Sequence, residues 1–497
     1  MSTTTETVTW SQYKPQETQR RLSRSSTITP SVSEYRSGFS KTAFGNIELE
    51  EIPDKQGNIT RATSNLESNS YPKALDPDAC PPKRSIALVL LNNLMSEMSL
   101  TIALPISAAY TEILGGTDAF SGLVIGIPTM ISLVCLYPML RFANPKSANG
   151  YTLYFRPLIV SCISQIIGHL LYSLAYRAQW LYLILIGRMC SGVGFTMFLY
   201  HKTYLTDKNF VGQNRSTFLA TLNILAQILG SMAGAFLGGI LAKASMHLTD
   251  PIWNQYTAGS WFMLFIWIVY SIFLSIFFKE VRVGNTATNV RKPESFTGKT
   301  APLSFKQKFM LCFLSMAAFI SIFNVAGYQT SVPIYAKALY HYNPFQSGNF
   351  LSLSSLVIAP FVFFSTFLSK WLEDRQIMLY GFMMGIVALI VHLVLDAVHK
   401  IPVQPYFVLY SIMQFGFSVG SAPLVSLATK QLHPKYHMIT GVVVQVGISI
   451  GETVGSICGG AIFDITTVGF IAMNLGIALL VFIQLLYLWT FIKTKTG

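Results

Sequence analysis

Charged residues are scarce in this chain. Of its 497 residues only 11% are charged and 52% are hydrophobic, with a mean hydropathy of +0.47. Soluble globular proteins carry about 25% charged residues, so water alone cannot solvate a chain of this composition. The scarcity of charge excludes an ordinary soluble protein and predicts that a lipid bilayer surrounds much of the surface.

Cysteine is also rare, and its placement excludes two kinds of site. The six cysteines form no CxxC pair, and no histidine or cysteine stands at metal-ligand spacing. We therefore expect neither a disulfide framework nor a metal site. The sequence also lacks a Walker loop, a dinucleotide fingerprint and an HExxH pair, so we expect no cofactor. Two G-x-S-x-G matches, at 416–420 and 447–451, lie inside apolar helical stretches, and we do not expect an enzyme.

What the chain does contain is a series of apolar segments of about 20 residues, the length that crosses a bilayer as a helix. Twelve are predicted, at 86–111, 121–142, 157–176, 181–204, 217–242, 258–278, 309–336, 347–369, 377–398, 404–429, 438–463 and 467–491. The expected fold class is an all-α membrane protein with twelve transmembrane helices. Residues 1–84 are rich in polar residues and are predicted to be a disordered tail, in which Arg20-Arg21-Leu22-Ser23 makes Ser23 a candidate regulatory site.

The net charge of +13 is distributed unevenly between the loops. Alternate loops are basic, and they hold Arg141, Lys146, Arg156, Lys208, Arg215, seven basic residues between 279 and 308, Lys370, Arg375, Lys435, Lys493 and Lys495. The other loops carry little beyond Arg177, Lys243, Lys337 and Lys400. By the positive-inside rule the basic loops and both termini are cytoplasmic. Because the charge follows membrane topology, we expect no nucleic-acid partner.

A repeat divides the membrane region. The longest internal loop, 280–308, is the predicted linker between a first half at 85–279 and a second half at 309–497, each with six spans. The fifth span contains Gly230, Gly234, Gly238 and Gly239, and the eleventh contains Gly451, Gly455, Gly459 and Gly460. The offset is 221 residues throughout (451 − 230 and 460 − 239). Such glycine stripes allow helices to approach closely, so we predict a helix-packing or gating role.

Ionisable residues inside membrane spans are costly to insert and are functional candidates. Glu97 lies near the middle of the first span and shares one side of the helix with Asn93. Glu452 lies near the middle of the eleventh span on the same stripe as Gln445. A buried carboxyl group can exchange protons near physiological pH. We predict that these residues line a substrate and proton pathway, with a structural hydrogen bond as the alternative.

Two further spans carry candidates for the same pathway. In the seventh span Asn324 and Tyr328 share a polar face, which suits either a polar substrate or hydrogen bonds between helices. In the fourth span Arg188 needs an anionic partner or a cluster of carbonyls, and both Glu97 and a substrate anion are candidates. Pro105 and Pro333, late in the first and seventh spans, are predicted to kink them.

These features together resemble the major facilitator superfamily. Gly187-Arg188 with Gly192 and Gly194 is similar to the Arg-Gly-Gly pattern of the family's fourth helix, which implies a role for Arg188 in proton coupling or in recognising substrate charge. The glycines from 230 to 239 resemble the family's antiporter motif, with Ala235 in place of its proline.

The segment between the second and fourth spans resembles one subfamily. Residues 141–146 depart from the superfamily pattern. Residues 156–159 and 171–176 are similar to the SPX-linked facilitators of fungi and plants, and to the animal lysosomal facilitator lost in one late-infantile ceroid lipofuscinosis. That resemblance implies a lysosomal or vacuolar membrane, with the plasma membrane as the alternative.

The resemblance implies a secondary active transporter that moves a small polar or charged solute by alternating access. Glu97 and Glu452 would take up and release protons. Two other functions stay open: an anion channel on the same fold, with Arg188 as its selectivity charge, and a non-transporting receptor or scaffold that uses the tail. The expected partners are the lipid bilayer, a small-molecule or ion substrate, and protons.

Overall fold

The computed structural model describes residues 78–143, 153–207, 210–280, 304–368, 371–398, 401–424, 427 and 437–490. Ser23, nearly all of the predicted tail and most of the predicted linker lie outside these residues. The described residues contain helices and no strand, and one isolated bridge joins Thr249 and Asn254.

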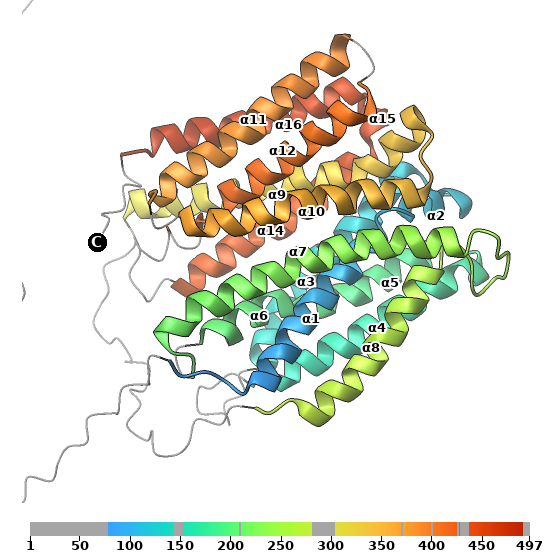
Figure 1. Ribbon diagram of the computed structural model, residues 1–497, viewed down its shortest axis with the longest axis horizontal. Coiled ribbons are helices and arrows are strands. Elements are labelled where there is room, and N and C mark those ends of the chain that lie inside the picture. Colours follow the sequence, from blue (N-terminus) through green and yellow to red (C-terminus); the bar gives the residue numbers. More distant parts are fainter. Residues whose placement is uncertain are drawn as a thin grey trace, which may run out of the picture. The chain divides into compact units, whose positions relative to one another are not determined.

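Each half of the chain supplies six spans (Figure 1). The first half contains α1 (Lys83–Thr101), α2 (Ser107–Ile113), α3 (Asp118–Ala143), α4 (Phe155–Ala178), α5 (Leu181–Gly194), α6 (Met197–Thr206), α7 (Gln213–Ala244) and α8 (Ala258–Phe277). The second half contains α9 (Phe305–Tyr340), α10 (Pro344–Leu368), α11 (Asp374–Val398), α12 (Val403–Ser421), α14 (His437–Gly460), α15 (Ile462–Ile465) and α16 (Thr467–Tyr487).

The prediction of twelve spans in two halves is confirmed. Short breaks divide three of the spans, so that α1 continues into α2, α5 into α6, and α14 into α15. Within the described part of the chain, ten helices are long and apolar enough to cross a membrane when α5 and α6 are taken as one. The first span, which α1 and α2 form, and α12 complete the twelve.

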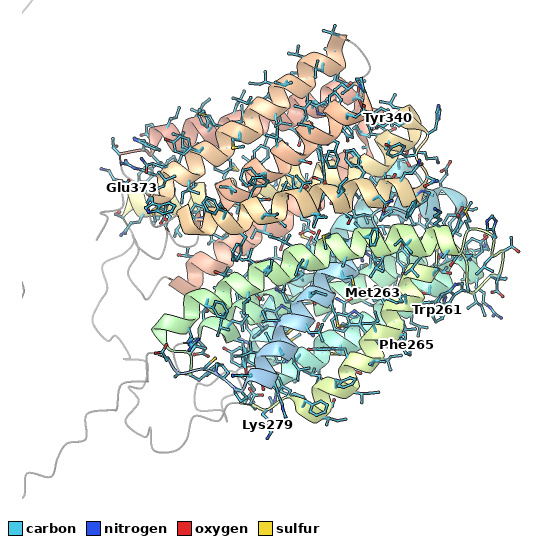
Figure 2. All side chains as sticks on the ribbon, viewed as in Figure 1. Trp261, Met263, Phe265, Lys279, Tyr340 and Glu373 are labelled. Atoms are coloured by element: carbon cyan, nitrogen blue, oxygen red, sulfur yellow. The ribbon has the colours of Figure 1, made fainter. Side chains whose placement is uncertain are left out.

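The outer surface of the bundle is apolar, as a helix in lipid requires. In α8, Phe265 is 67% exposed and Ile276 is 65% exposed, whereas Met263 and Trp267 are fully buried. Figure 2 labels Met263 and Phe265 on this helix. Exposing apolar surface to water costs about 25 cal/mol per Å². Because lipid tails solvate such side chains, this face of α8 is stable in a bilayer and would not be stable in water.

One of the two predicted kinks is a complete break in the helix. Pro105 has no N–H to donate to the carbonyl of Thr101, and Leu104 donates to that carbonyl instead, at 3.1 Å. The chain between α1 and α2 therefore runs through turns at 102–106. Pro333, in contrast, lies within the uninterrupted helix α9.

The glycine stripes of α7 and α14 pack in the same way in their own halves. Each lies against backbone carbonyls of the first helix of its half, at Gly230–Leu94, Gly234–Met98 and Gly238–Ile102, and at Gly451–Phe319, Gly455–Phe323 and Gly459–Gly327. The partners are offset by a constant 225 residues (319 − 94, 323 − 98 and 327 − 102). Therefore α1 is equivalent to α9 and α7 to α14, and the repeat in sequence is also a repeat in structure.

The last glycine of each stripe faces the opposite half. A Cβ atom on Gly239 would lie 3.2 Å from Phe345 of α10, and one on Gly460 would meet the carbonyl oxygen of Asp118 in α3. Figure 1 shows α7 and α10 side by side across this boundary. Two seams, α7 with α10 and α3 with α14, thus join the halves.

We name the two ends of the bundle after one lysine each. At the Lys83 end, α1 begins, and α16 is followed by Trp489, whose carbonyl accepts a 2.8 Å hydrogen bond from Arg375. Lys279 and Glu373 also lie at this end, and Tyr340 lies at the other (Figure 2). The Lys337 end contains α2, the end of α9 and the start of α10. The glycine contacts of both seams lie between the middle of the helices and the Lys337 end.

Candidate functional site

A cavity of about 250 Å³ lies between the two halves. Its walls come from α1, α3, α6 and α7 of the first half and from α9 and α14 of the second. The lining residues are Glu97, Leu100, Thr101, Thr129, Ser132, Phe198, Lys202, Gln227, Ser231, Ile322, Val325, Ala326, Gln329, Gln445, Ile448 and Glu452. The structure thus brings Glu97 of the first half to the same cavity as Gln445 and Glu452 of α14 in the second half.

Equivalent positions of the two halves face this cavity with different chemistry. Residues of α1 and α9 are equivalent at an offset of 225, and residues of α7 and α14 at an offset of 221. The equivalent pairs in which both members line the cavity are Glu97 with Ile322, Leu100 with Val325, Thr101 with Ala326, Gln227 with Ile448 and Ser231 with Glu452. In three of these five pairs the first half supplies a charged or polar residue and the second half an apolar one. The first half therefore supplies most of the polar lining. The second half supplies an apolar surface beside Gln329 and Gln445, and Glu452 is the charge that it contributes.

Three ionisable side chains line the cavity: Glu97, Glu452 and Lys202. Among the described residues, none of the three forms a side-chain hydrogen bond or an ion pair within 4.0 Å. Glu97 interacts electrostatically with Lys202 and with Glu452. Because an unpaired charge in a membrane interior is costly, these three groups make the cavity the candidate functional site.

The sequence prediction omits Lys202. The residue lies near the end of the predicted span 181–204, and the same criterion that selected Glu97, an ionisable residue inside a span, would have selected it. The direction of the Lys202 side chain depends on the break between α5 and α6, where the backbone N–H of Phe195 donates to the carbonyl of Gly192 at 3.2 Å. After this break, α6 carries Phe198 and Lys202 to the cavity wall.

Arg188 is 2% exposed and is bound by three backbone carbonyls. Its Nε donates to Val124 at 3.1 Å, its Nη1 to Ser99 at 3.0 Å and its Nη2 to Leu100 at 3.3 Å. The carbonyls of Ser99 and Leu100 stand at the end of α1, where the break leaves helix carbonyls without N–H partners. Of the partners considered from sequence, the carbonyl cluster is observed, and no ion pair with Glu97 forms within the described part of the chain.

Ser99 connects this cluster to two more helices. Its Oγ accepts a hydrogen bond from Trp267 Nε1 of α8 at 2.8 Å and lies 3.1 Å from His169 Nε2 of α4. All of these side chains are buried. The end of α1 is therefore fixed by α3, α4, α5 and α8 together, and Glu97 stands half a turn before Ser99 on that fixed helix.

Three residues predicted for the pathway lie away from the cavity. Asn93 is buried and donates from Nδ2 to Asn223 at 2.9 Å. Asn324 donates to the carbonyl of Ile320 at 2.8 Å, and Tyr328 OH lies 3.0 Å from His392 Nδ1. In this conformation all three make hydrogen bonds within their own half, which is the alternative that the sequence left open.

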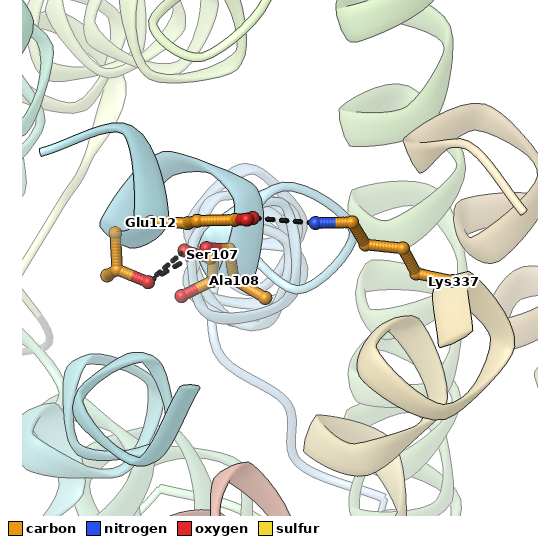
Figure 3. A network of polar contacts seen from close by, with 5 residues as sticks. Ser107, Ala108, Glu112 and Lys337 are labelled. Atoms are coloured by element: carbon orange, nitrogen blue, oxygen red, sulfur yellow. Dashed lines mark hydrogen bonds and ion pairs between the residues drawn. The ribbon is translucent and has the colours of Figure 1, made fainter. Parts of the chain in front are cut away.

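An ion pair joins the halves at the Lys337 end. Lys337 Nζ of α9 lies 2.6 Å from Glu112 Oε2 of α2, and the two side chains are 56% and 63% exposed (Figure 3). The residues occupy equivalent positions of the repeat, since 337 − 112 is also 225. Figure 3 also shows the hydrogen bonds within α2, in which the side chain of Thr111 donates to the carbonyls of Ser107 and Ala108.

A second cavity, of about 490 Å³, adjoins this ion pair and is lined by Ile106, Ala109, Glu112, Ile113, Gln255, Tyr256, Lys337 and Pro344. The ion pair and the two glycine seams lie on the Lys337 side of the central cavity. The central cavity lies on the other side of these contacts: Thr453 donates to Gly126 at 3.0 Å, and Ser132 and Gln445 line the cavity farther toward the Lys83 end.

The family model and the relatives that match this chain point to the same family of membrane transporters. The family profile of the Major Facilitator Superfamily matches residues 87–444. An uncharacterized MFS-type transporter of Schizosaccharomyces pombe is 76% identical over 498 residues, covering 100% of both chains. Another from the same species is 57% identical and covers 92% of this chain and 93% of its own. An SPX domain-containing membrane protein of Arabidopsis thaliana is 29% identical over 39% of this chain and 26% of its own.

Solved structures with the same fold include two transporters. A bacterial homologue of the human lysosomal transporter Spinster, in an inward-facing and occupied conformation, has a TM-score of 0.63, with 14% identity over 84% of this chain and 100% of that chain. A POT family transporter in complex with a thioalcohol-conjugated peptide has a TM-score of 0.61, with 12% identity over 82% of this chain and 97% of that chain. At these identities the likeness shows the fold alone.

Replacement of Arg188 should destabilise the protein. Arg188→Met keeps a long side chain but leaves the buried carbonyls of Ser99, Leu100 and Val124 without donors, at a cost of about 1–3 kcal/mol for each unsatisfied group. We expect a clear fall in the thermal unfolding midpoint of the purified protein in detergent. Arg177→Met, at an exposed arginine in the last turn of α4, is the matched control and should leave the midpoint unchanged. Equal midpoints for both variants would contradict a structural role for Arg188.

Breaking the ion pair at the Lys337 end should make that end open more often. An exposed pair contributes about 0–1 kcal/mol, and a charge reversal replaces this attraction by repulsion of similar size. Glu112→Lys or Lys337→Glu should therefore shift the balance between closed and open forms by up to about 30-fold. The measurement is the labelling rate of a cysteine placed at Ala109, which lines the adjoining cavity. The charge-swapped double variant should restore the slow rate, whereas a rate as fast as the sum of the single effects would show that the two residues do not act as a pair.

Proposed function

This chain belongs to the Major Facilitator Superfamily, and we propose that it is a secondary active transporter that couples the movement of a small polar or charged solute to protons. Membership of the family, together with two uncharacterized MFS-type transporters that match over nearly the full length, supports a membrane transporter rather than an enzyme. The solute, the coupling and the membrane are the parts that we propose.

The observation that carries the proposal is the central cavity with its unpaired carboxyl groups. The cavity lies between two equivalent halves that are joined at the Lys337 end. If the halves rock about the cavity, the contacts at that end separate while equivalent surfaces close at the Lys83 end, which is alternating access. Glu97 and Glu452 come from different halves, so the solute and the proton would both bind at the boundary between the moving halves.

The charges on the cavity wall suggest how coupling would work. With both carboxyl groups ionised, Glu97 and Glu452 repel each other, Lys202 attracts Glu97, and Arg188 attracts Glu452. A proton on either carboxyl group removes the repulsion and one net negative charge, which changes the electrostatic cost of bringing the halves together. A solute that binds these groups would change the same balance, and the two ligands would therefore be coupled.

Two other functions predict different measurements. An anion channel would conduct without saturation, but the guanidinium of Arg188 already donates to three carbonyls, so Lys202 is the cation left to select an anion. A receptor or scaffold would bind a partner through the tail and would carry no flux. Bilayer recording of the purified chain separates a channel from a carrier, and the absence of any solute or proton movement would favour the scaffold.

We also propose a lysosomal or vacuolar membrane with the Lys83 end in the cytoplasm. The basic residues near this end, among them Arg141, Lys279 and Lys306, support that orientation. Fluorescence of the full chain with a C-terminal tag should coincide with a vacuolar membrane dye, and the tag should be digested by protease only when cytoplasm is accessible. A signal confined to the plasma membrane would contradict the proposed location.

Removal of either cavity carboxyl group should abolish coupling. Proteoliposomes that contain a pH-sensitive dye are exposed in turn to amino acids, sugars, phosphate and organic cations, and a carried solute should move protons. We expect Glu97→Gln and Glu452→Gln to reduce this solute-driven proton movement to the level of protein-free liposomes, because each removes one proton-exchanging group. Glu373→Gln is the matched control, since Glu373 pairs with Arg375 at the Lys83 end. Unchanged proton movement in both cavity variants would rule out this coupling mechanism.

A further inference from the structure

We propose that the central cavity binds a small amphipathic zwitterion, a solute with one ammonium group, one carboxylate group and an apolar body. An aliphatic α-amino acid is the simplest member of this class. The inference rests on the proposed transport function and deepens it, since it names the substrate class of the same cavity.

Both signs of charge stand unpaired on the cavity wall. Glu97 and Glu452 carry carboxylates and Lys202 carries an ammonium group, and none has an ion-pair partner within the described part of the chain. An anion alone would be repelled by the two carboxylates, and a cation alone would be repelled by Lys202. A zwitterion pairs with both signs, and unpaired buried charge is what binding must avoid.

The protonation of the two cavity carboxyl groups also favours a zwitterionic solute. Glu97 and Glu452 repel each other when both are ionised, so a proton on either carboxyl group relieves the repulsion. The wall then carries one carboxylate and one ammonium group, which is the charge complement of a zwitterion. With both carboxyl groups ionised, the wall still presents both signs, so a zwitterion remains the better match in either state.

The positive charge of Arg188 interacts with Glu452, but its N–H groups are bound by backbone carbonyls. Arg188 is 2% exposed, and its Nε, Nη1 and Nη2 atoms donate to backbone carbonyls. It does not line the cavity. Within the described lining, Lys202 is thus the cation that would bind the carboxylate of a solute.

The apolar surface of the second half selects for an apolar body. Ile322, Val325 and Ala326 of α9 and Ile448 of α14 face the cavity from the second half. Burying apolar surface against them is favourable by about 25 cal/mol per Å². The volume of about 250 Å³ lies below the range of roughly 300–1,000 Å³ of drug-sized sites, so the solute must be small.

A matched set of three probes tests the charge requirement. L-Leucine carries both charges, 3-methylbutylamine lacks the carboxylate, and 4-methylpentanoate lacks the amine, while all three share one branched carbon skeleton. Binding to the purified full chain is measured by thermal stabilisation and by competition with radiolabelled leucine at neutral pH. We expect leucine to bind about tenfold or more tightly than either analogue, because each analogue loses one charge-assisted hydrogen bond.

Two variants assign the charges. Lys202→Met should weaken leucine binding about tenfold and leave 3-methylbutylamine binding unchanged or stronger, because the repelling ammonium group is gone. Glu452→Gln should weaken leucine and strengthen 4-methylpentanoate relative to it. Lys308→Met, at an exposed lysine in the first turn of α9, is the matched control and should bind all three probes as the unmodified chain does.

The outcomes separate this inference from the proposed function. If phosphate, sulfate or an uncharged sugar binds and is carried while leucine and its analogues are not, the zwitterion class is overturned and transport stands. If leucine binds no better than either analogue, the charge complement is likewise overturned. If the folded protein moves no solute of any class in proteoliposomes, the transport function itself fails.

Discussion

A guanidinium in the interior of a membrane protein must be satisfied by the protein, and Arg188 meets this constraint with backbone carbonyls. Two of those carbonyls exist as free acceptors because the first span breaks at 102–106, where Pro105 cannot donate. The break and the arginine therefore depend on each other. The break supplies free carbonyl acceptors, and Arg188 supplies the N–H donors that these carbonyls need. With Trp267 and His169 on Ser99, this arrangement fixes the end of α1. The polar lining from the first half depends on it, since Glu97 and Thr101 belong to that same helix.

The repeat explains why the two halves line the cavity with unlike side chains. The glycine contacts give α1 and α9 the same geometry in their halves, so that residues 225 apart occupy equivalent places. Equivalence of the backbone leaves side chains free to differ, and Glu97 lines the cavity at the place where the second half has Ile322. Two nearly equal halves are suited to exchanging roles during alternating access, while unlike side chains would favour one orientation of a bound solute.

The sequence alone was sufficient for the spans and the repeat but only partly sufficient for the site. Spans follow from the length of apolar segments, and glycine spacing depends on helix geometry, so both can be read without tertiary structure. Glu97 and Glu452 were identifiable because a carboxyl group inside an apolar segment is rare. The partners of Arg188, the burial of Asn93 against Asn223 and the direction of Lys202 were not, because each depends on breaks or on neighbouring helices that are distant in the sequence.

The contacts at the Lys337 end are suited to a closure that must also open. Glu112 and Lys337 are more than half exposed, and such a pair contributes about 0–1 kcal/mol, so it can orient the two halves without locking them. At the seams, Gly460 against α3 and Gly239 against α10 allow close contact between backbones with no side chain interposed, and helices in such contact can slide without any side chain leaving a pocket. Strong interactions, such as those of Arg188, Ser99 and Trp267, instead lie within one half. A transporter that moves its halves as rigid bodies requires this division, with strong contacts inside each half and weak ones between them.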